Sequence, residues 1–503
     1  MFLAHRKRAL ATAVAAASAV VGGLLSAPVA GATAAGPAAA PARTPMSPFS
    51  SAQWASGTGN TLADVAATIG SNRAAAAGLT GKGVGIALID TGVVPVPGLP
   101  AEQVVNGPDL SIDSQADSQR YLDAYGHGTH LAGIVAGLAP GAKLTSIKVG
   151  TANGAADVSQ VIAALDWLAQ HRNDDPANPI RIVCLAYGTD ANASWADDPL
   201  FLAVENATKA GMLVMVAGGN NGAAAGRLNS PSLNYSVVTV GSAATHGTVT
   251  QADDTLSTFT SVDPLAPLDV VAPGESIVSL RNPGSYVDTT NPSARVGETH
   301  FRGSGSSQAT AVVAAGAALL LQKAPATTPR SLKIWLQNSS TRMRGDAAKY
   351  TGGELNIATA LTLSVPRATA VKQASTGLGS LQAARGSIQV LDDTTPLTGE
   401  RTVYGAHDAR GWAAASKAAT AWKGGLWMGH RVAGDGWTGT SWASRTWAGA
   451  TWPGTNWSNR TWGDGAWSGR AWSGRAWSST TWSSRYWSSS TWKDNGWSTS
   501  AWR

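Results

Sequence analysis

Three glycine-bounded segments supply an acid, a base and a hydroxyl. Asp90 ends an apolar run and precedes a Gly turn, and His127 lies between two glycines at the start of a small-residue helix pattern. Ser307 follows a Gly-Ser-Gly-Ser stretch that opens a long apolar helix pattern. A serine hydroxyl becomes a nucleophile when an imidazole takes its proton and a carboxylate orients that imidazole. These residue types predict acyl-transfer chemistry if the fold brings them together.

Each segment alone also has an ordinary structural explanation. An Asp at a strand end and a Ser at a helix start commonly cap helices or form turns. His127 and His130 could be read as a metal pair, but the zinc-protease pattern needs an i, i+4 pair and an adjoining Glu, and both are missing. Asn220, in the Gly-rich turn at 217–222, could serve that turn, or its carboxamide could donate to a developing oxyanion.

The elements that must position these residues alternate between apolar strand patterns and helix-sized segments. The strand patterns lie at 84–89, 144–149, 182–185, 212–216 and 237–240, and helix patterns lie at 157–171 and 199–209. This alternation predicts an α/β fold, a three-layer αβα sandwich with a mainly parallel central sheet. Ligand sites in such sheets form beyond the carboxyl ends of the strands, which is where Asp90 and Asn220 are placed.

In the order Asp, His, Asn, Ser, these four segments resemble those of the subtilisin-like serine peptidases. The resemblance covers about residues 75–365 and extends to flanking residues at 81–84, 139–142, 271–274 and 352–356. It implies a catalytic triad in which Ser307 is the nucleophile, His127 the general base and Asp90 the group that orients the imidazole. It also implies an oxyanion hole formed by the Asn220 side chain and the Ser307 backbone N–H.

The resemblance further implies where a polypeptide substrate binds. The walls of the main specificity pocket would be formed by Leu185, Ala186, Tyr187 and Gly188, and by Ala217, Gly218 and Gly219. An extended peptide would then bind as an added strand. The chain has Gln308 and Ala311 where the family usually has Met and Pro, and Tyr187 where it usually has Leu. We expect Gln308 to change the packing behind the nucleophile and Tyr187 to narrow or roof the groove.

The first 61 residues read as targeting and leader sequence. Residues 1–32 have a basic start, an Ala-rich apolar run and an A-x-A site, as in a secretory signal peptide. A membrane anchor is the alternative, but the run is short for a span. Residues 33–61 are predicted to be a disordered leader or short pro-segment, followed by the peptidase domain at 62–365. We expect a secreted, extracellular mature chain without a membrane span, and the single cysteine, Cys184, excludes an intrachain disulfide.

Beyond a small β-rich connector at 366–408, residues 409–503 form a tail in which Trp recurs every five residues. Five residues turn about 140° on a helix, so no helical face collects the rings. They form either a repetitive stacked core or an exposed ladder that binds a polymer. From Trp412 the tail holds ten Lys/Arg and three Asp, which favours an anionic cell-wall or glycan polymer as the ligand. Nucleic acid is disfavoured, although interleaved basic and aromatic residues keep it open. The tail resembles those of secreted subtilisin-like proteins of high-GC Gram-positive bacteria.

The sequence therefore predicts a secreted serine endopeptidase that hydrolyses peptide bonds through an Asp-His-Ser triad and an acyl-enzyme intermediate. The alternative is a catalytically inactive protein of the same fold that binds the cell surface through its Trp-rich tail. We expect polypeptide substrates, no cofactor and no metal ligands. Association with the cell wall through the tail is left open, beside a tail that is structural or of low complexity and has no ligand. A structural calcium ion is left open.

Overall fold

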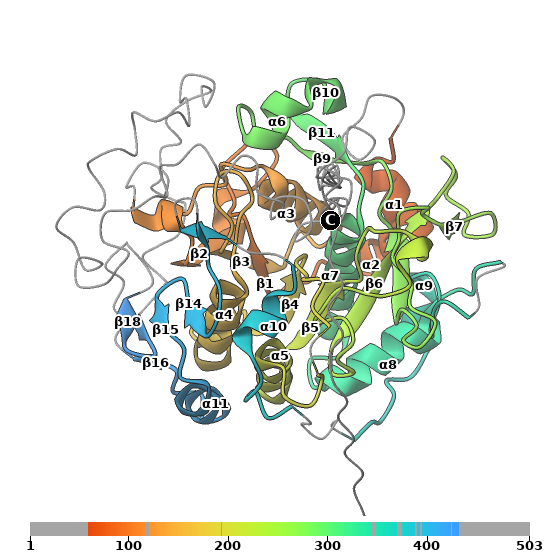
Figure 1. The fold of residues 1–503 in the computed structure, drawn as a ribbon. Helices are drawn as coiled ribbons and strands as arrows, with labels where there is room; N and C mark the ends of the chain where they lie inside the picture. Colours follow the sequence, from red (N-terminus) through yellow and green to blue (C-terminus); the bar gives the residue numbers. More distant parts are fainter. Residues whose placement is uncertain are drawn as a thin grey trace, which may run out of the picture. The chain divides into compact units, whose positions relative to one another are not determined.

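The computed structural model describes residues 59–431 apart from 116–119, 193, 345–347, 370–374, 388–389, 393–394 and 424. The predicted signal peptide, most of the predicted leader and the Trp repeats after residue 431 lie outside the described residues. The main feature is an eight-stranded sheet in the order β2-β3-β1-β4-β5-β6-β7, with β8 also paired to β6 (Figure 1). Its strands are β1 (Gly85–Asp90), β2 (Val104–Asp109), β3 (Lys143–Lys148), β4 (Ile180–Leu185), β5 (Leu213–Ala217), β6 (Val238–Ala244), β7 (Thr255–Leu256) and β8 (Val270–Pro273).

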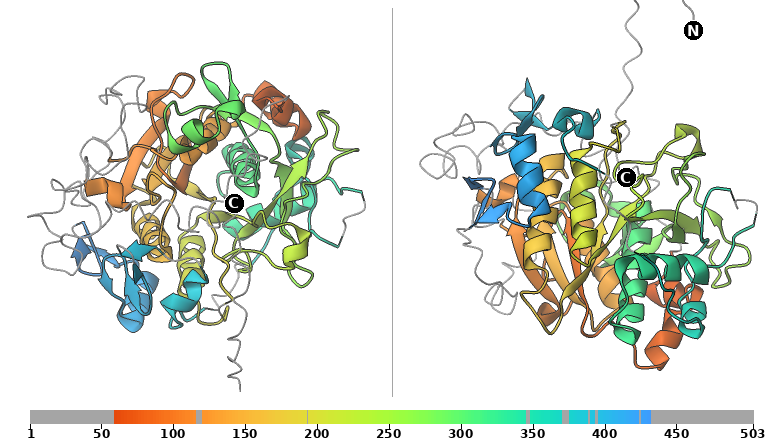
Figure 2. Two further views of the ribbon diagram at one scale, coloured as in Figure 1. Left: turned by 45° about the horizontal axis from the view of Figure 1, so that its top comes forward. Right: turned by 90° about the horizontal axis from the view of Figure 1, so that it is seen from below.

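Helices cover both faces of this sheet, whose pairings are parallel except for β6 with β7 (Figures 1 and 2). They are α3 (His127–Leu138) and α7 (Ser306–Lys323) on one face, and α4 (Val158–His171) and α5 (Pro199–Lys209) on the other. Alternate side chains of β1 face the two layers, because side chains on a strand point to opposite faces. Ile86 and Leu88 pack with α3 and α7, whereas Ala87 and Ile89 pack with α4 and α5. The predicted three-layer αβα sandwich with a mainly parallel sheet is confirmed.

Smaller elements complete this part of the chain. They are α1 (Leu62–Thr68), α2 (Ser71–Ala76), α8 (Pro329–Ser339), α9 (Ile357–Thr362), the second sheet β9 (Ile277–Leu280), β10 (Arg295–Val296) and β11 (His300–Gly303), and α6 (Tyr286–Thr290) between β9 and β10. Short 3₁₀ helices lie at Ala101–Gln103, Ile112–Gln115, Ala223–Ala225 and Pro292–Ala294. None of the helices in the described part is both long and apolar enough to cross a membrane.

Two residues assigned to the leader belong to the folded domain. The backbone N–H of Asn60 donates to Ser276 O at 2.8 Å, and Asn60 forms a parallel bridge with Ile277. Thr61 is the N-cap of α1, and its hydroxyl accepts from the backbone N–H of Asp64 at 3.2 Å. The expectation of a leader extending to residue 61 is therefore corrected, because a capping box and a bridge hold these residues against the core.

Residues 375–431, which we call the C-terminal cap, pack on the outer side of α4 and α5 (Figure 1). Its elements are α10 (Leu381–Arg385), β12 (Leu391–Asp392), β13 (Thr395–Pro396), β14 (Arg401–Thr402), β15 (Gly405–Ala406), α11 (Ala409–Lys417), β16 (Trp422–Lys423), β17 (Leu426–Trp427) and β18 (His430–Arg431). Within the connector predicted to be β-rich, β14 and β15 form a short hairpin. The cap runs past residue 408, where the composition changes, because the first Trp of the repeats are part of its core.

Three Trp of the pentad pattern are buried core residues. The indole N–H groups of Trp412 and Trp427 donate to the same oxygen, Oδ2 of Asp166 on α4, at 2.8 and 2.9 Å. The Trp422 indole donates to Ala163 O at 2.9 Å, and the Ser416 hydroxyl bonds the second Asp166 oxygen. A buried carboxylate needs several such donors to be tolerated in the core. These three Trp are therefore core residues packed on α4, whereas the later repeats lie outside the described residues.

Asp166→Asn should change how stability depends on pH. Burial raises the pKa of Asp166 from 3.8 to about 6. A carboxyl with a raised folded-state pKa favours folding below its unfolded pKa, and this contribution is lost as pH rises through the folded pKa. Relative to the wild type, the unfolding free energy of Asp166→Asn should therefore gain about 3 kcal/mol between pH 4 and pH 7.

Urea unfolding at several pH values measures this difference. Lys423→Gln, an exposed change on the same cap, leaves Asp166 and its donors in place and should track the wild type. Parallel pH profiles for Asp166→Asn and the wild type would show that Asp166 does not titrate in this way.

Candidate active site

The end of β1 and the start of α3 bring a carboxylate and an imidazole into contact. His127 Nδ1 lies 2.8 Å from Asp90 Oδ1 and 3.0 Å from Oδ2, and both residues are buried. A carboxylate at Nδ1 selects the tautomer that carries its proton there, which leaves Nε2 as the basic nitrogen. The structure therefore brings Asp90 and His127 together as predicted, with the imidazole oriented for general-base chemistry.

Two glycines permit this close approach. Gly126 has φ 108°, in the left-handed region that favours glycine. A Cβ on Gly128 would lie 2.1 Å from the carbonyl oxygen of Gly92, so no larger residue fits there without movement of the backbone. The first turn of α3 can contact the end of β1 only because both positions lack a side chain.

A second carboxylate, which the sequence analysis did not identify, holds this turn in place. Asp123 accepts from the backbone N–H groups of Gly126 at 2.6 Å and Thr129 at 2.8 Å, and from the Thr91 hydroxyl at 2.8 Å. Burial raises the pKa of Asp123, while these hydrogen bonds act to lower it. The available signal was an Asp just before a helix start, typical of an N-cap, but its reach to Thr91, next to Asp90, is a tertiary contact.

His130 is a structural residue. Its Nε2 lies 3.2 Å from Phe301 O, and burial lowers the pKa of His130 to about 3. The imidazole is therefore neutral at physiological pH. These contacts agree with the sequence-based rejection of a metal pair with His127.

Ser307 and Asn220 meet at the start of α7. The Ser306 backbone N–H donates to Asn220 Oδ1 at 2.8 Å, which ties the loop after β5 to this helix start. Ser307 Oγ and Asn220 Nδ2 are buried and have no hydrogen-bond partner among the described residues. A Cβ on Gly305 would lie 3.2 Å from Asn220 Nδ2, so this donor reaches the backbone two residues before Ser307. Buried polar groups without partners are costly, and here they are a hydroxyl and an amide donor available to a ligand.

All four residues lie at one edge of the sheet. β1, β4 and β5 run parallel, Asp90 ends β1, and Asn220 follows β5. α3 and α7 pack against each other and begin at this edge with His127 and Ser307 in their first turns. The carboxyl edge of the sheet therefore holds the acid, the base, the amide donor and the nucleophile, as the strand-end positions predicted.

The predicted pocket walls are fully buried, and one expectation about them is wrong. Tyr187 does not narrow or roof a groove, because its side chain is 0% exposed and packs in the core with α4 and α5. The reason is the period of two along the strand, which sends Leu185 and Tyr187 toward these helices and Ala186 to the other face. Burial raises the pKa of Tyr187 well above its ordinary value.

The other wall and the residue beside the nucleophile lie where the resemblance placed them. Gly218 accepts from the backbone N–H of Asn229 at 3.0 Å, and the Gly219 N–H lies 3.3 Å from Ser306 Oγ, so this wall adjoins the start of α7. Ala217, the last residue of β5, is 2% exposed. Gln308 is buried, and its carboxamide has no hydrogen-bond partner in the described part of the chain.

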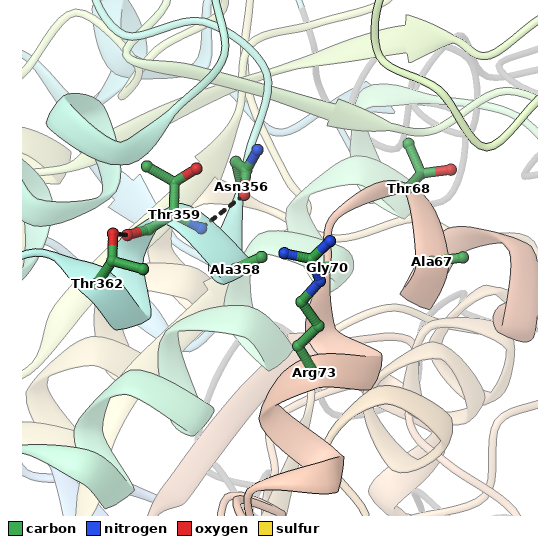
Figure 3. Close-up of a pocket in the computed structure, with 8 residues that line it drawn as sticks. All are labelled: Ala67, Thr68, Gly70, Arg73, Asn356, Ala358, Thr359 and Thr362. Atoms are coloured by element: carbon green, nitrogen blue, oxygen red, sulfur yellow. Dashed lines mark hydrogen bonds between the residues drawn. The ribbon is translucent and has the colours of Figure 1, made fainter.

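A separate hollow of about 250 Å³ lies between α1, α2 and α9 (Figure 3). Its polar lining includes Arg73 and residues that serve the ends of α9: Asn356 Oδ1 accepts from Thr359 N at 2.8 Å, and the Thr362 hydroxyl donates to Thr359 O at 2.8 Å. None of the predicted site residues lines this hollow. The chemistry therefore belongs to the sheet edge.

Comparison with known proteins agrees with this geometry. Residues 81–360, which include all four site residues, match the subtilase family. The chain is 37% identical over 296 residues to the serine protease AprX of Bacillus subtilis, covering 55% of this chain and 66% of that protein. It is 31% identical over 288 residues to subtilisin Savinase of Lederbergia lenta, covering 56% and 91%. A solved structure, fervidolysin from Fervidobacterium pennivorans, has a TM-score of 0.48 and 22% identity, covering 61% of this chain and 46% of that one.

Asn220→Ala tests the amide donor. If Asn220 Nδ2 binds an oxyanion that forms only during reaction, its loss should lower kcat roughly 10²–10³-fold with little change in KM. Steady-state kinetics on a peptide substrate measures both. The matched control is Asn221→Ala, which alters the exposed neighbouring carboxamide and should leave kcat unchanged. An unchanged kcat in Asn220→Ala, or equal losses in both variants, would contradict the assignment.

Proposed function

Because the chain belongs to the subtilase family of serine peptidases, we propose that it acts as an extracellular serine endopeptidase on polypeptides. The observation that carries this proposal is the buried Asp90–His127 hydrogen bond at the same sheet edge as Ser307 Oγ and Asn220 Nδ2, neither of which has a hydrogen-bond partner among the described residues. The chain spans 66% of AprX and 91% of Savinase, so the proposal concerns the domain they share.

The proposed reaction is an acyl transfer in two steps. His127 Nε2 takes the proton from Ser307 Oγ as this oxygen attacks the scissile carbonyl carbon, and Asp90 stabilises the resulting imidazolium. Asn220 Nδ2 and the Ser307 N–H donate to the oxyanion. His127 then returns the proton to the leaving amine, and water hydrolyses the acyl-enzyme by the same route. The hydroxyl, imidazole and amide supply every group that this reaction needs, so we propose no cofactor.

The competing candidate is a catalytically inactive protein that binds the cell surface. It would need no oriented imidazole and no buried amide donor without a partner. The Asp123 contacts support the catalytic candidate, because they hold the turn that carries His127 and so keep its imidazole in the orientation that proton transfer requires.

A fluorophosphonate probe separates these two candidates. We expect the wild type to be labelled covalently at Ser307, because the probe requires an activated serine, and Ser307→Ala to remain unlabelled. Intact-mass measurement before and after labelling reads out the result. The matched control is Ser306→Ala, which removes the neighbouring hydroxyl and should retain labelling. An unlabelled wild type, or equal labelling of Ser307→Ala, would contradict the catalytic proposal.

We also propose that the Trp repeats after residue 431 bind an anionic cell-wall or glycan polymer and retain the enzyme at the cell wall. The support is compositional: regularly spaced Trp, with Arg as the most frequent charged residue and few carboxylates. Rings can stack on sugars, and the basic side chains attract anionic groups. A structural role like that of Trp412 and Trp422, and binding to nucleic acid, are the alternatives.

Binding to isolated cell wall tests this role. The full chain with Ser307→Ala, which prevents self-cleavage, should sediment with cell wall, and added salt should weaken this binding because screening reduces charge attraction. The control is the same variant truncated after residue 431, which lacks the later Trp repeats. The truncation is not made after residue 408, because Trp412 and Trp427 stabilise the folded core. Equal sedimentation of both chains would contradict the proposal, as would displacement by DNA but not by soluble cell-wall polymer.

A further inference from the structure

The C-terminal cap is attached to the loop that continues the predicted pocket wall. The wall ends at Gly188, and the next residue, Thr189, donates its hydroxyl proton to Ala384 O of the cap at 2.8 Å. Asp190 accepts from the backbone N–H of Ser387 at 2.7 Å and also bonds the Ser387 hydroxyl. The cap therefore bonds to the first two residues beyond this wall.

The same loop joins the two predicted walls to each other. Thr189 and Ser230 exchange both backbone hydrogen bonds, at 2.9 and 2.8 Å. The neighbouring N–H of Asn229 donates to Gly218 O at 3.0 Å, within the second wall. A Cβ on Gly188 would lie 2.8 Å from the Asn229 Cβ, so the walls are also in close packing contact. The Thr189 hydroxyl thus connects the cap to the Thr189–Ser230 hydrogen bonds, which set the spacing between the walls.

Arg385, which directly follows Ala384, fixes this part of the cap. Its Nε donates to Asp157 Oδ2 at 2.6 Å, and both side chains are 1% exposed. Its remaining nitrogens donate to the carbonyl oxygens of Gly399, at 2.9 Å, and Arg401. Asp157 is the N-cap of α4 and belongs to its capping box. A planar guanidinium held by this many bonds in a dry interior has one orientation, so Ala384 O is held rigidly with respect to α4.

The wall and the cap also share a hydrophobic core. Tyr187 belongs to the same core cluster as Leu381 and Ala384 of α10. The Tyr at the position where the family usually has Leu is therefore part of the core that the cap completes.

We propose that the C-terminal cap sets the shape of the substrate pocket, with Arg385 as the positioning residue that acts through Ala384, Thr189 and Tyr187. This inference rests on the proposed peptidase function. It makes the cap part of the specificity apparatus although no cap residue belongs to the triad. The recognised chemistry is the side chain that precedes the scissile bond in an extended peptide.

The test compares Arg385→Gln with the wild type on peptides that differ only in the residue before the scissile bond. We expect KM to rise about tenfold for large apolar residues and much less for small ones, with kcat nearly unchanged, because binding rather than the reacting groups is disturbed. The rate of fluorophosphonate labelling should stay unchanged, since the substitution leaves Asp90, His127 and Ser307 in place. Arg385→Lys keeps the charge but not the forked set of donors, so its KM should lie between those of the wild type and Arg385→Gln.

Asp190→Ala provides a second route, because removal of Arg385 leaves the Asp157 carboxylate buried without its partner and could unfold the chain. Asp190 is partly exposed, so its loss removes the bonds from the wall loop to Ser387 without leaving such a charge, while the Thr189–Ala384 bond remains. For Asp190→Ala we expect KM to rise for large apolar residues before the scissile bond, but by less than in Arg385→Gln. Lys423→Gln, exposed on the cap and away from the wall, is the control and should match the wild type.

The outcomes separate this inference from the proposed function. The role of the cap would be overturned if the wild type is labelled and Asp190→Ala keeps the wild-type KM and the wild-type preference for the residue before the scissile bond. A folded Arg385→Gln variant with an unchanged preference would also overturn it. A wild type that is not labelled at all would instead overturn the peptidase function.

Discussion

The contact between the end of β1 and the first turn of α3 is the constraint on which the catalytic geometry depends. Gly128 lies against the Gly92 carbonyl oxygen, where a Cβ would collide, and this close approach places the Asp90 carboxylate against His127 Nδ1 at 2.8 Å. Asp123 then holds the turn from the other side. A rigid arrangement of this kind reduces the reorganisation that the reaction requires, because the carboxylate that stabilises the imidazolium is in place before the imidazolium forms.

Buried carboxylates link distant segments throughout this protein. Asp123 joins the His127 loop to Thr91, Asp166 joins α4 to Trp412 and Trp427, and Asp157 joins α4 to Arg385. Such a group is tolerated only while its donors are present, so each one specifies a single partner segment. The consequence is a C-terminal cap that belongs to the peptidase domain physically, although it begins after the region shared with other subtilases has ended at residue 360.

Under the proposed function, the Trp repeats have more than one role within one pattern. Trp412, Trp422 and Trp427 each bury a ring and satisfy its indole N–H, which is the arrangement expected of a core Trp. The proposed polymer binding concerns the repeats beyond Arg431. The pentad spacing looks the same on both sides of that residue, so spacing alone does not distinguish a ring that packs from a ring that binds.

The sequence by itself predicted the α/β fold and several of its strands and helices, because strand and helix periodicity and Gly-rich turns are local properties. The four residues at the sheet edge were identified from their Gly-rich segments together with the family resemblance. The burial of Tyr187 also followed a local rule, the period of two, that our expectation of a roof over the groove overlooked. Only the tertiary structure decided the roles of Asp123, Asp166 and Arg385. Their partners lie up to 261 residues away along the chain, and no local pattern encodes which donor a buried charge will meet. For the same reason, composition predicted a domain that ends near residue 365, whereas the packing of the C-terminal cap on α4 and α5 extends it.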